Sequence, residues 1–326
     1  MKRILKTGLF SLLFLSAIAV SAQQEPQRKK IKTIVIDPGH GGLDPGAPGT
    51  FSTEAQVSLA VSLKLGKALE KEFPEIKQVF TRKTDVLPGN KPNKDAALKY
   101  RADLANESGG DLFIAVHCNS AGRRAGGWNA QRISHYETST KKVKSKGKWV
   151  TKTYKKPVYE TYWVENTVRG TETYIWAVSK NDAKINSMTH NNEYYGEIDS
   201  TSTIELPDPS DPAEKARLLI YTQHYFRKSL NLASLIEREF VDSGRVSRGV
   251  KQRNDKGIWV LQATGMPSIL IEIGFISNKQ EEEYMNSEEG QNAIVKNIIN
   301  ALRTYILTIE GKLKEPAKTE EPKKAF

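Results

Sequence analysis

Three short apolar runs in this sequence each end at a residue that can bind a metal or move a proton. Ile34-Val35-Ile36 leads into Asp37-Pro-Gly-His40-Gly-Gly, residues 112–116 lead into His117, and residues 268–271 lead into Glu272. Runs this short and this rich in β-branched residues predict buried strands. Because open α/β sheets place their ligands at the carboxyl ends of the strands, we expect these three side chains to meet in one site.

The rest of the chain alternates predicted strands with predicted helices. We expect strands at 33–36, 77–81, 112–117, 171–178, 258–261 and 268–272, and helices at 54–72, 94–108, 213–241, 279–286 and 288–308. This alternation predicts an α/β fold with a mixed, mostly parallel sheet that has helices on both faces.

Glu54 is the best candidate for a third ligand beside the two histidines. It begins a predicted helix whose apolar residues pack inward. Two histidines and a carboxylate are typical of catalytic zinc centres, which keep a fourth position open for water. A carboxylate in the first turn of a helix is also favoured by the helix dipole, so helix capping alone would explain Glu54 taken by itself.

The chain resembles the zinc-dependent N-acetylmuramoyl-L-alanine amidases of bacterial cell walls from about Lys32 to Leu307. Besides the turn at 37–42, the matching motifs are Asp44-Pro-Gly-Ala, Glu54, Thr81-Arg82, Arg101, Ala105-Asn106, His117-Cys-Asn119-Ser, Gly170-Thr-Glu-Thr-Tyr174, Arg248-Gly-Val-Lys-Gln252, Val260-Leu261 and Pro267-Ser-Ile-Leu-Ile-Glu272-Ile-Gly-Phe-Ile-Ser-Asn278. One departure is Ala55 after Glu54, where the family usually has Lys or Asn.

This resemblance implies a zinc-peptidase or amidase-like fold and assigns roles to the site residues. His40, Glu54 and His117 would bind Zn2+, and Glu272 would be the catalytic carboxylate, which takes a proton from water and passes it to the leaving amine. The bond cut would be the amide between N-acetylmuramic acid and L-alanine in peptidoglycan, during cell separation or wall turnover.

Two residues beside the ligands are candidates for orienting them. We expect Asp37 to orient His40 and Asn119 to orient His117, since metal-bound histidines usually donate their second ring N–H to a fixed acceptor. For Asp37, a role as a turn residue stays open.

Two other functions are compatible with the same residues. One is a zinc peptidase that cuts the peptide stem of peptidoglycan elsewhere, and the other is a catalytically silent wall-binding protein. The long ordered match to the amidases argues against the first, and the presence of all four site residues argues against the second.

The N-terminal segment predicts export, and the rest of the chain divides into a linker, a domain and a tail. Residues 1–22 have the basic start, apolar stretch and small-residue end of a signal peptide, and 23–31 form a linker. The catalytic domain is expected at 32–310, with insertions at 120–169 and 181–215, followed by a disordered tail at 311–326. The mature protein is therefore expected to be periplasmic or secreted, with no transmembrane segment.

The insertion at 120–169 is strongly basic. It holds twelve Lys or Arg against three acidic residues, within a chain whose formal charge is +11. Its two halves are rich in Thr, Tyr, Val and Trp around a turn at 144–148, which predicts a β-ribbon. The ribbon would either bind glycan, anionic wall or a partner protein, or be a solvated hairpin. Basic and aromatic residues also suit nucleic acid, but a secreted location argues against that partner.

The insertion at 181–215 is acidic, with eight Asp or Glu against two Lys. It lies where some family members carry a helix that covers the zinc until an activator protein displaces it. We expect Glu193, or second Glu197, to occupy the open zinc position, since an acidic loop is favoured near a dication. The alternative is an acidic surface loop with no regulatory role.

A capped zinc predicts an enzyme that is slow on its own. Glu193→Ala, or deletion of 184–212, should raise the basal rate of hydrolysis without changing the bond that is cut, because a tethered carboxylate competes with water and substrate at a high effective concentration. Initial rates on a muramyl peptide measure this. An unchanged basal rate in both variants, with the metal still bound, would exclude a capped enzyme.

Overall fold

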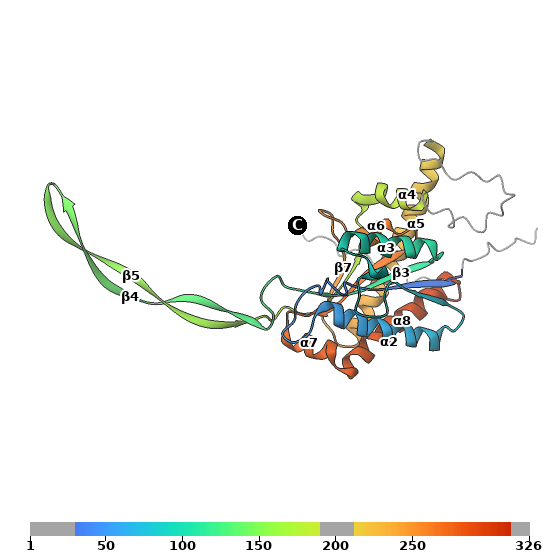
Figure 1. Cartoon of the computed structure of the whole chain (residues 1–326), viewed down its shortest axis with the longest axis horizontal. Helices are drawn as coiled ribbons and strands as arrows, with labels where there is room; N and C mark the ends of the chain where they lie inside the picture. Colours follow the sequence, from blue (N-terminus) through green and yellow to red (C-terminus); the bar gives the residue numbers. More distant parts are fainter. Residues whose placement is uncertain (1–29, 190–211, 314–326) are drawn as a thin grey trace, which may run out of the picture. The chain divides into compact units, whose positions relative to one another are not determined.

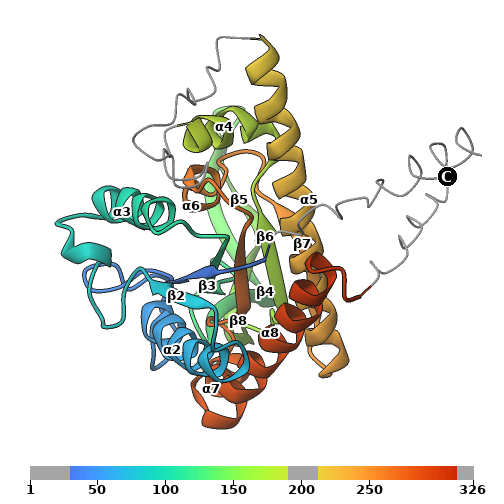
Figure 2. The same ribbon diagram turned by 90° about the vertical axis from the view of Figure 1, so that its right-hand side faces the viewer.

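The computed structural model describes residues 30–189 and 212–313. Within them a six-stranded sheet runs in the order β2-β1-β3-β8-β6-β7 (Figures 1 and 2). Its strands are β1 (Thr33–Pro38), β2 (Lys77–Phe80), β3 (Leu112–Asn119), β6 (Thr171–Ile175), β7 (Ser247–Gln252) and β8 (Ser268–Phe275). The first four strands in the sheet are mutually parallel, and β6 and β7 run the opposite way. The predicted mixed, mostly parallel sheet is confirmed.

Parallel pairing aligns the carboxyl ends of the three central strands. In the register of β3 and β8, His117 lies opposite Glu272, and Glu272 in turn lies opposite Glu172 of β6. Residues paired in this way point to the same face of a sheet. One row of three ionisable side chains therefore crosses the centre of the sheet, directly beside the turn in which His40 lies.

Helices cover both faces of the sheet, as predicted (Figure 2). They are α2 (Glu54–Glu72), α3 (Lys94–Glu107), α4 (Asn181–Thr189), α5 (Pro212–Asp242), α6 (Trp259–Ala263), α7 (Lys279–Asn286) and α8 (Glu288–Ile309). Alternate residues of β1 and β3, such as Val35, Phe113 and Ala115, form a buried cluster with residues of α3 to α6. The intervening side chains are also buried and point to the opposite face, where α2 packs on β1 and β3. Both faces of the central strands are therefore core.

The start of α2 is fixed by local sequence. Thr53 caps the helix by accepting from the backbone N–H of Gln56, and the Gln56 side chain accepts from the N–H of Thr53. This reciprocal capping places Glu54 at the first helical position. The predicted and observed bounds of α2 agree.

The prediction of a strand at 258–261 is wrong. Residues Trp259–Ala263 form the short helix α6, and Val260 and Leu261 are buried in the core cluster. Four apolar residues in a row do not distinguish a strand from the buried side of a helix. The strand of this region is β7 at 247–252. Its sequence does not predict a strand, because it contains charged residues and Gly249, whose φ is 80°.

The basic insertion forms the predicted ribbon. Strands β4 (Gly127–Ser145) and β5 (Lys148–Glu165) pair antiparallel along their whole length, with one bulge near Ile133. They turn at Lys146 and Gly147, both of which have a positive φ, as a two-residue hairpin turn requires. Figure 1 shows a long twisted ribbon, and among the described residues no third strand pairs with it.

The acidic insertion begins with α4, which is attached to the core through Lys184. This lysine is fully buried, and its Nζ donates to the carbonyl oxygens of Leu261 and Met266 and to the hydroxyl of Ser268. Burial lowers the pKa of Lys184. Deleting 184–212 would remove this anchor as well, so Glu193→Ala is the cleaner of the two variants.

Several predictions fall on residues outside the described ranges. They are the signal peptide (1–22), nearly all of the linker (23–31), Glu193 and Glu197, and most of the tail (311–326). Of the helices that the structure describes, none is both long enough and apolar enough to cross a membrane. Residues 31–305 form one compact unit.

A buried carboxylate fixes the loop that leads into α2. Glu282 of α7 accepts from the backbone N–H groups of Thr50, Phe51 and Ser52 at 2.7, 3.0 and 2.8 Å. Its oxygens also accept from the hydroxyls of Thr50 and Ser52. Burial alone would raise the pKa of Glu282, but these five donors outweigh it and lower the pKa below the usual 4.5.

Glu282→Gln should lower the free energy of unfolding by about 1–3 kcal/mol at pH 7, because an amide replaces the doubly accepting carboxylate. A lowered pKa gives stability that is complete above pH 4.5 and is lost as the pH falls below it. The variant should therefore lose less stability on acidification. Denaturant unfolding at pH 7 and pH 4 measures both effects. Glu283→Gln, at an exposed neighbour, is the control, and equal effects of the two substitutions would contradict the prediction.

Candidate metal centre and active site

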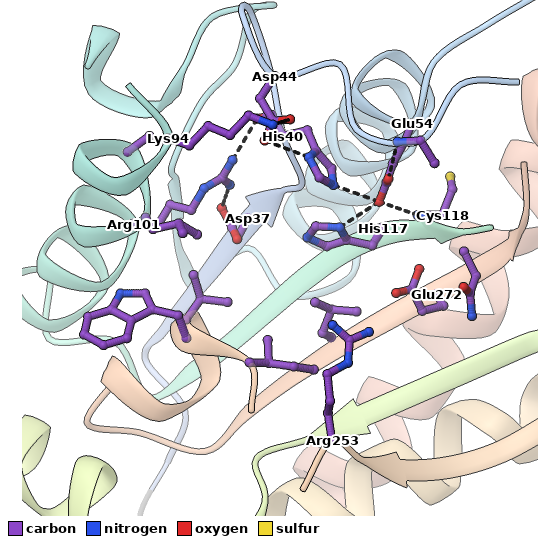
Figure 3. Close-up of a pocket in the computed structure, with 18 of the residues that line it drawn as sticks. Asp37, His40, Asp44, Glu54, Lys94, Arg101, His117, Cys118, Arg253 and Glu272 are labelled. Carbon is purple, nitrogen blue, oxygen red and sulfur yellow. Dashed lines mark hydrogen bonds and ion pairs between the residues drawn. The ribbon is translucent and has the colours of Figure 1, made fainter. Parts of the chain in front are cut away.

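The three predicted metal ligands converge. One ligand atom each from His40, Glu54 and His117 lies within 4.8 Å of the other two (Figure 3). Glu54 Oε1 accepts from His117 Nδ1 at 2.8 Å and from His40 Nε2 at 3.1 Å. The three residues come from the turn after β1, the first turn of α2 and the end of β3, so the site is assembled from three separate elements.

The charges in this cluster are strongly coupled. Burial by itself would raise the pKa of Glu54, but the two imidazoles outweigh it and hold the pKa far below the usual value. Burial by itself would lower the pKa of His40. The carboxylates of Glu54 and Asp44 outweigh burial and raise this pKa above the usual 6.5. Glu54 is thus held in its charged form, which is the form in which a carboxylate binds a metal.

Two glycines allow the ligands to approach each other. A Cβ at Gly39 would lie 2.5 Å from the ring of His117, and a Cβ at Gly46 would lie 2.6 Å from Glu54 Oε2. Gly46 also has a φ of 68°, a left-handed conformation that disfavours other residues. Any larger side chain at either position would displace a ligand.

Asp44, and not Asp37, contacts the ring of His40. Asp44 Oδ2 lies 2.9 Å from His40 Nδ1, and Lys94 pairs with the other oxygen of the same carboxylate. The prediction that Asp37 orients His40 directly is wrong. The turn carries Asp37 away from the ring, and the tight hairpin between Gly41 and Asp44 brings Asp44 back to it.

Asp37 instead acts on the backbone of the turn through Arg101. Asp37 Oδ1 accepts from Thr81 Oγ1 and from Arg101, whose guanidinium also donates to the carbonyl oxygens of Pro38 and His40. His40 has a φ of 58°, which is uncommon for a residue with a side chain. The buried ion pair holds it in this conformation.

Arg82 completes the support of the turn. Its guanidinium donates to the carbonyl oxygens of Pro38, Gly39 and Ala55, so it joins the His40 turn to the first turn of α2. Burial and the neighbouring Arg101 lower the pKa of Arg82 to about 10. Arg82 and Arg101 therefore fix the relative position of His40 and Glu54.

Glu272 lies in the same pocket with one oxygen unpaired. Its Oε2 is buried and has no hydrogen-bond partner among the described residues. Burial, reinforced by the carboxylates of Glu54 and Glu172, raises the pKa of Glu272 well above its usual value. A buried carboxyl with a raised pKa, aimed into a pocket, is suited to proton transfer near neutral pH.

Asn119 contacts Glu172 and not His117. The Asn119 amide donates to Glu172 Oε2 at 2.9 Å, whereas the His117 ring contacts Glu54, so the prediction that Asn119 orients His117 is wrong. Glu172 is buried and also accepts from Tyr174, Arg248 and Lys251. Burial would raise the pKa of Glu172, but these donors lower it.

These residues line a cavity of about 490 Å³ at the carboxyl edge of the parallel strands. The lining includes the candidate ligands and Glu272, together with Ile258, Trp259 and Arg253 from the segment after β7. Figure 3 shows Arg253 reaching into the cavity toward Glu272. The cavity is the right size for a small part of a larger substrate.

Comparison with known proteins gives the family. The family model for N-acetylmuramoyl-L-alanine amidase matches residues 34–304. This chain belongs to that family. The match includes all four predicted site residues and confirms the family resemblance of the sequence.

Relatives of this amidase-family chain extend along most of its length. It is 26% identical over 305 residues to "Probable N-acetylmuramoyl-L-alanine amidase AmiB" of Haemophilus influenzae, covering 92% of this chain and 57% of the relative. It is 25% identical over 291 residues to N-acetylmuramoyl-L-alanine amidase AmiC of Escherichia coli, covering 87% and 56%. The chain thus spans little more than half the length of these relatives.

Solved structures share the fold. The CwlD amidase of Clostridioides difficile, in complex with the GerS lipoprotein, matches with a TM-score of 0.51 and 21% identity, covering 84% of this chain and 98% of that one. An N-acetylmuramoyl-L-alanine amidase from Clostridium difficile 630 matches with a TM-score of 0.50 and 22% identity, covering 85% and 98%.

Sequence reasoning missed the roles of Asp44, Arg82, Arg101 and Glu172. All four lie in motifs that match the family, but the sequence alone gives none of them a role. The available signal was local for Asp44, which lies four residues after His40. For the other three, most partners lie 27 or more residues away in the sequence, and only the fold shows them.

Arg101→Lys should lower the free energy of unfolding by about 1–3 kcal/mol, because one ammonium cannot replace the planar fork that binds Asp37 and two carbonyl oxygens. Denaturant unfolding measures the loss. Arg303→Lys is the matched control, since the pair of Arg303 with Glu72 is partly exposed and should contribute little. Equal losses in the two variants would contradict the role given to Arg101.

Proposed function

We propose that this protein is a zinc-dependent N-acetylmuramoyl-L-alanine amidase. It hydrolyses the amide between N-acetylmuramic acid and L-alanine in peptidoglycan, for cell separation or wall turnover. The observation that supports this most is the convergence of His40, Glu54 and His117 beside the unpaired oxygen of Glu272, within a chain that matches the amidase family over residues 34–304.

The donor set fits zinc. Two imidazole nitrogens and one carboxylate oxygen form a catalytic zinc site that leaves a position free. The second nitrogen of His40 is already bound to Asp44, which fixes its tautomer and ring orientation, as is usual for metal-bound histidines. Bound zinc supplies a Lewis acid that polarises the amide carbonyl and makes water more acidic.

Glu272 moves the proton. Its Oε2 accepts a proton from the attacking water and then delivers it to the amide nitrogen, so that L-alanine leaves as an amine. Burial and the carboxylates of Glu54 and Glu172 favour the neutral form of this carboxyl, and a dication at the three ligands would favour its charged form. Because these two effects oppose each other, the Glu272 carboxyl can both accept a proton and donate it.

The cell location and regulation belong to the same proposal. The predicted signal peptide and the wall substrate support a periplasmic or secreted protein. The predicted control, in which Glu193 or Glu197 occupies the open zinc position until an activator protein displaces it, falls on residues outside the described ranges and is part of this proposal. The complex of the CwlD amidase with the GerS lipoprotein shows that one protein of this fold assembles with a protein partner.

Purified peptidoglycan and mass spectrometry test the bond that is cut. The zinc-loaded protein should release peptide stems with a free L-alanine amino group and leave glycan strands without peptides. Cleavage within the stem would identify a peptidase instead. Complete absence of products from both the wild type and Glu193→Ala would identify a silent wall-binding protein.

Glu272→Gln should keep the metal and lose about 10²-fold or more of the hydrolysis rate, since it removes proton transfer and no ligand. His117→Ala should lose the metal and the activity together. Zinc content by mass spectrometry and initial rates on a muramyl peptide separate the two variants. A near-normal rate for Glu272→Gln would exclude the mechanism above.

Asp44→Asn should weaken zinc binding about 10–100-fold, because the neutral amide is a weaker acceptor for the His40 ring than the carboxylate and can also turn its NH2 group toward the ring. Competition with a chromophoric chelator measures the affinity. Asp85→Asn is the control, since Asp85 accepts from the backbone of Gly42 and does not touch a ligand ring. Wild-type affinity in Asp44→Asn would rule out the orienting role.

A further inference from the structure

The distal half of the ribbon, residues 135–158, is a concentrated positive charge. It contains eight lysines and a single acidic residue, Glu137. All eight lysines are exposed, and none has a carboxylate within 4 Å among the residues that the structure describes. This segment therefore has no internal neutralisation.

The lysines occupy both faces of the ribbon. Alternation along the paired strands puts Lys141, Lys148, Lys152 and Lys156 on one face and Lys142, Lys144 and Lys155 on the other. Lys141 and Lys152 lie directly opposite each other, an arrangement that destabilises an isolated ribbon. The sequence keeps this repulsion in a two-stranded element that has little stability of its own. A bound polyanion would remove it.

We propose that this ribbon binds the carboxylate-rich mesh of peptidoglycan and so retains the enzyme on its substrate. The inference rests on the function proposed above. A planar membrane can contact only one face of a ribbon at a time, whereas a polymer mesh surrounds both, which suits lysines on both faces. Exposed aromatic residues between the lysines, including Trp149 at the turn and Tyr154, offer flat surfaces for sugar rings.

The test uses the full chain and insoluble peptidoglycan. A quadruple variant with Lys141→Gln, Lys142→Gln, Lys152→Gln and Lys155→Gln should sediment with purified sacculi at least tenfold more weakly than wild type, and four Lys→Arg substitutions at the same positions should not. Wild-type binding should fall with added salt and on sacculi whose carboxylates have been converted to amides.

The catalytic site gives an independent control. Both variants should cleave a small soluble muramyl peptide at the wild-type rate, since the ribbon lies outside the cavity. Wild-type binding by the Gln variant, or equal binding to amidated sacculi, would overturn the proposal. Binding of the wild type to phosphatidylglycerol vesicles and not to sacculi would also overturn it. Failure to cleave any muramyl peptide would instead count against the proposed function alone, because sedimentation does not depend on turnover.

A separate observation concerns substrate selection inside the cavity. Three cationic side chains line it: Lys94 is paired with Asp44 and Arg101 with Asp37, but Arg253 has no carboxylate within 4 Å in the described parts of the chain. Arg253 lies over the ring of Tyr174, with 5.5 Å between its Cζ and the ring centroid. A guanidinium held against an aromatic ring and aimed into a cavity is suited to a carboxylate ligand.

We infer that Arg253 selects substrates with a free carboxylate on the residue that follows L-alanine in the stem peptide. This inference also rests on the proposed function. Because Arg253 faces Glu272 across the cavity, a substrate whose scissile amide lies at Glu272 directs its next residue toward the opposite wall. Trp259 and Ile258, which also line the cavity, offer apolar surface to the peptide backbone and the L-alanine methyl group.

A matched pair of substrates tests this inference. Muramyl-L-alanyl-γ-D-glutamyl-L-lysine and muramyl-L-alanyl-D-isoglutaminyl-L-lysine differ only in the α-carboxylate of the second residue, which is a neutral amide in the second substrate, while its γ-carboxyl is used by the peptide bond to lysine in both. Wild type should prefer the first by roughly tenfold in kcat/KM, the size of one charge-assisted hydrogen bond. Arg253→Gln should lose the preference, and Arg253→Lys should keep part of it.

The alternative role of Arg253 is to tune Glu272. In that case Arg253→Gln would lower kcat/KM equally for both substrates and leave their ratio unchanged, and that result would overturn the inference. No preference in the wild type would overturn it as well. If the zinc-loaded wild type cleaves neither substrate, the proposed function is the part that fails.

Discussion

The site depends on the carbonyl groups of the turn after β1. Residues 38–40 leave the sheet with His40 in a left-handed conformation, so three carbonyl oxygens lose regular strand partners in a buried place. Arg82 and Arg101 bind all three, and Arg82 also binds the carbonyl of Ala55 in α2. Two planar donors, with Asp37 beside them, therefore set the geometry of two proposed ligands on separate elements.

The remaining site residues depend on strand register. Parallel pairing of β3 with β8 places His117 beside Glu272, and antiparallel pairing of β8 with β6 adds Glu172 to the same row. Glu172 has four donors around it, whereas Glu272 has an oxygen with none in the described structure. Two carboxylates in adjacent strands thus have opposite pKa shifts, the pattern by which one fold separates a structural acid from a proton-transfer group.

Charge is unevenly divided between the domain and its insertions. The ribbon carries lysines that nothing in the described structure neutralises, and the 181–215 segment is acidic. The ribbon contributes no strand to the central sheet, and neither do the described residues of the 181–215 segment. The sequence of the ribbon is therefore free of the packing constraints that govern the core, and its charge can serve binding.

The sequence alone predicted the fold class and the family, which are confirmed, and most element bounds. It also predicted four site residues, His40, Glu54, His117 and Glu272, which the fold brings together. These depend on local signals: β-branched runs, a capping box at Thr53 and glycine-rich turns. Only the tertiary structure decided what supports them. Asp37 and Asn119 lie next to ligands in the chain but bind elsewhere, while Arg82, Arg101 and Glu172 act across long sequence separations. Likewise, the apolar run at 258–261 predicts a strand, but the structure has the short helix α6 there, with Val260 and Leu261 packed in the core. Hydrogen-bond partners across a fold are set by register and packing, which the order of residues along one strand does not encode.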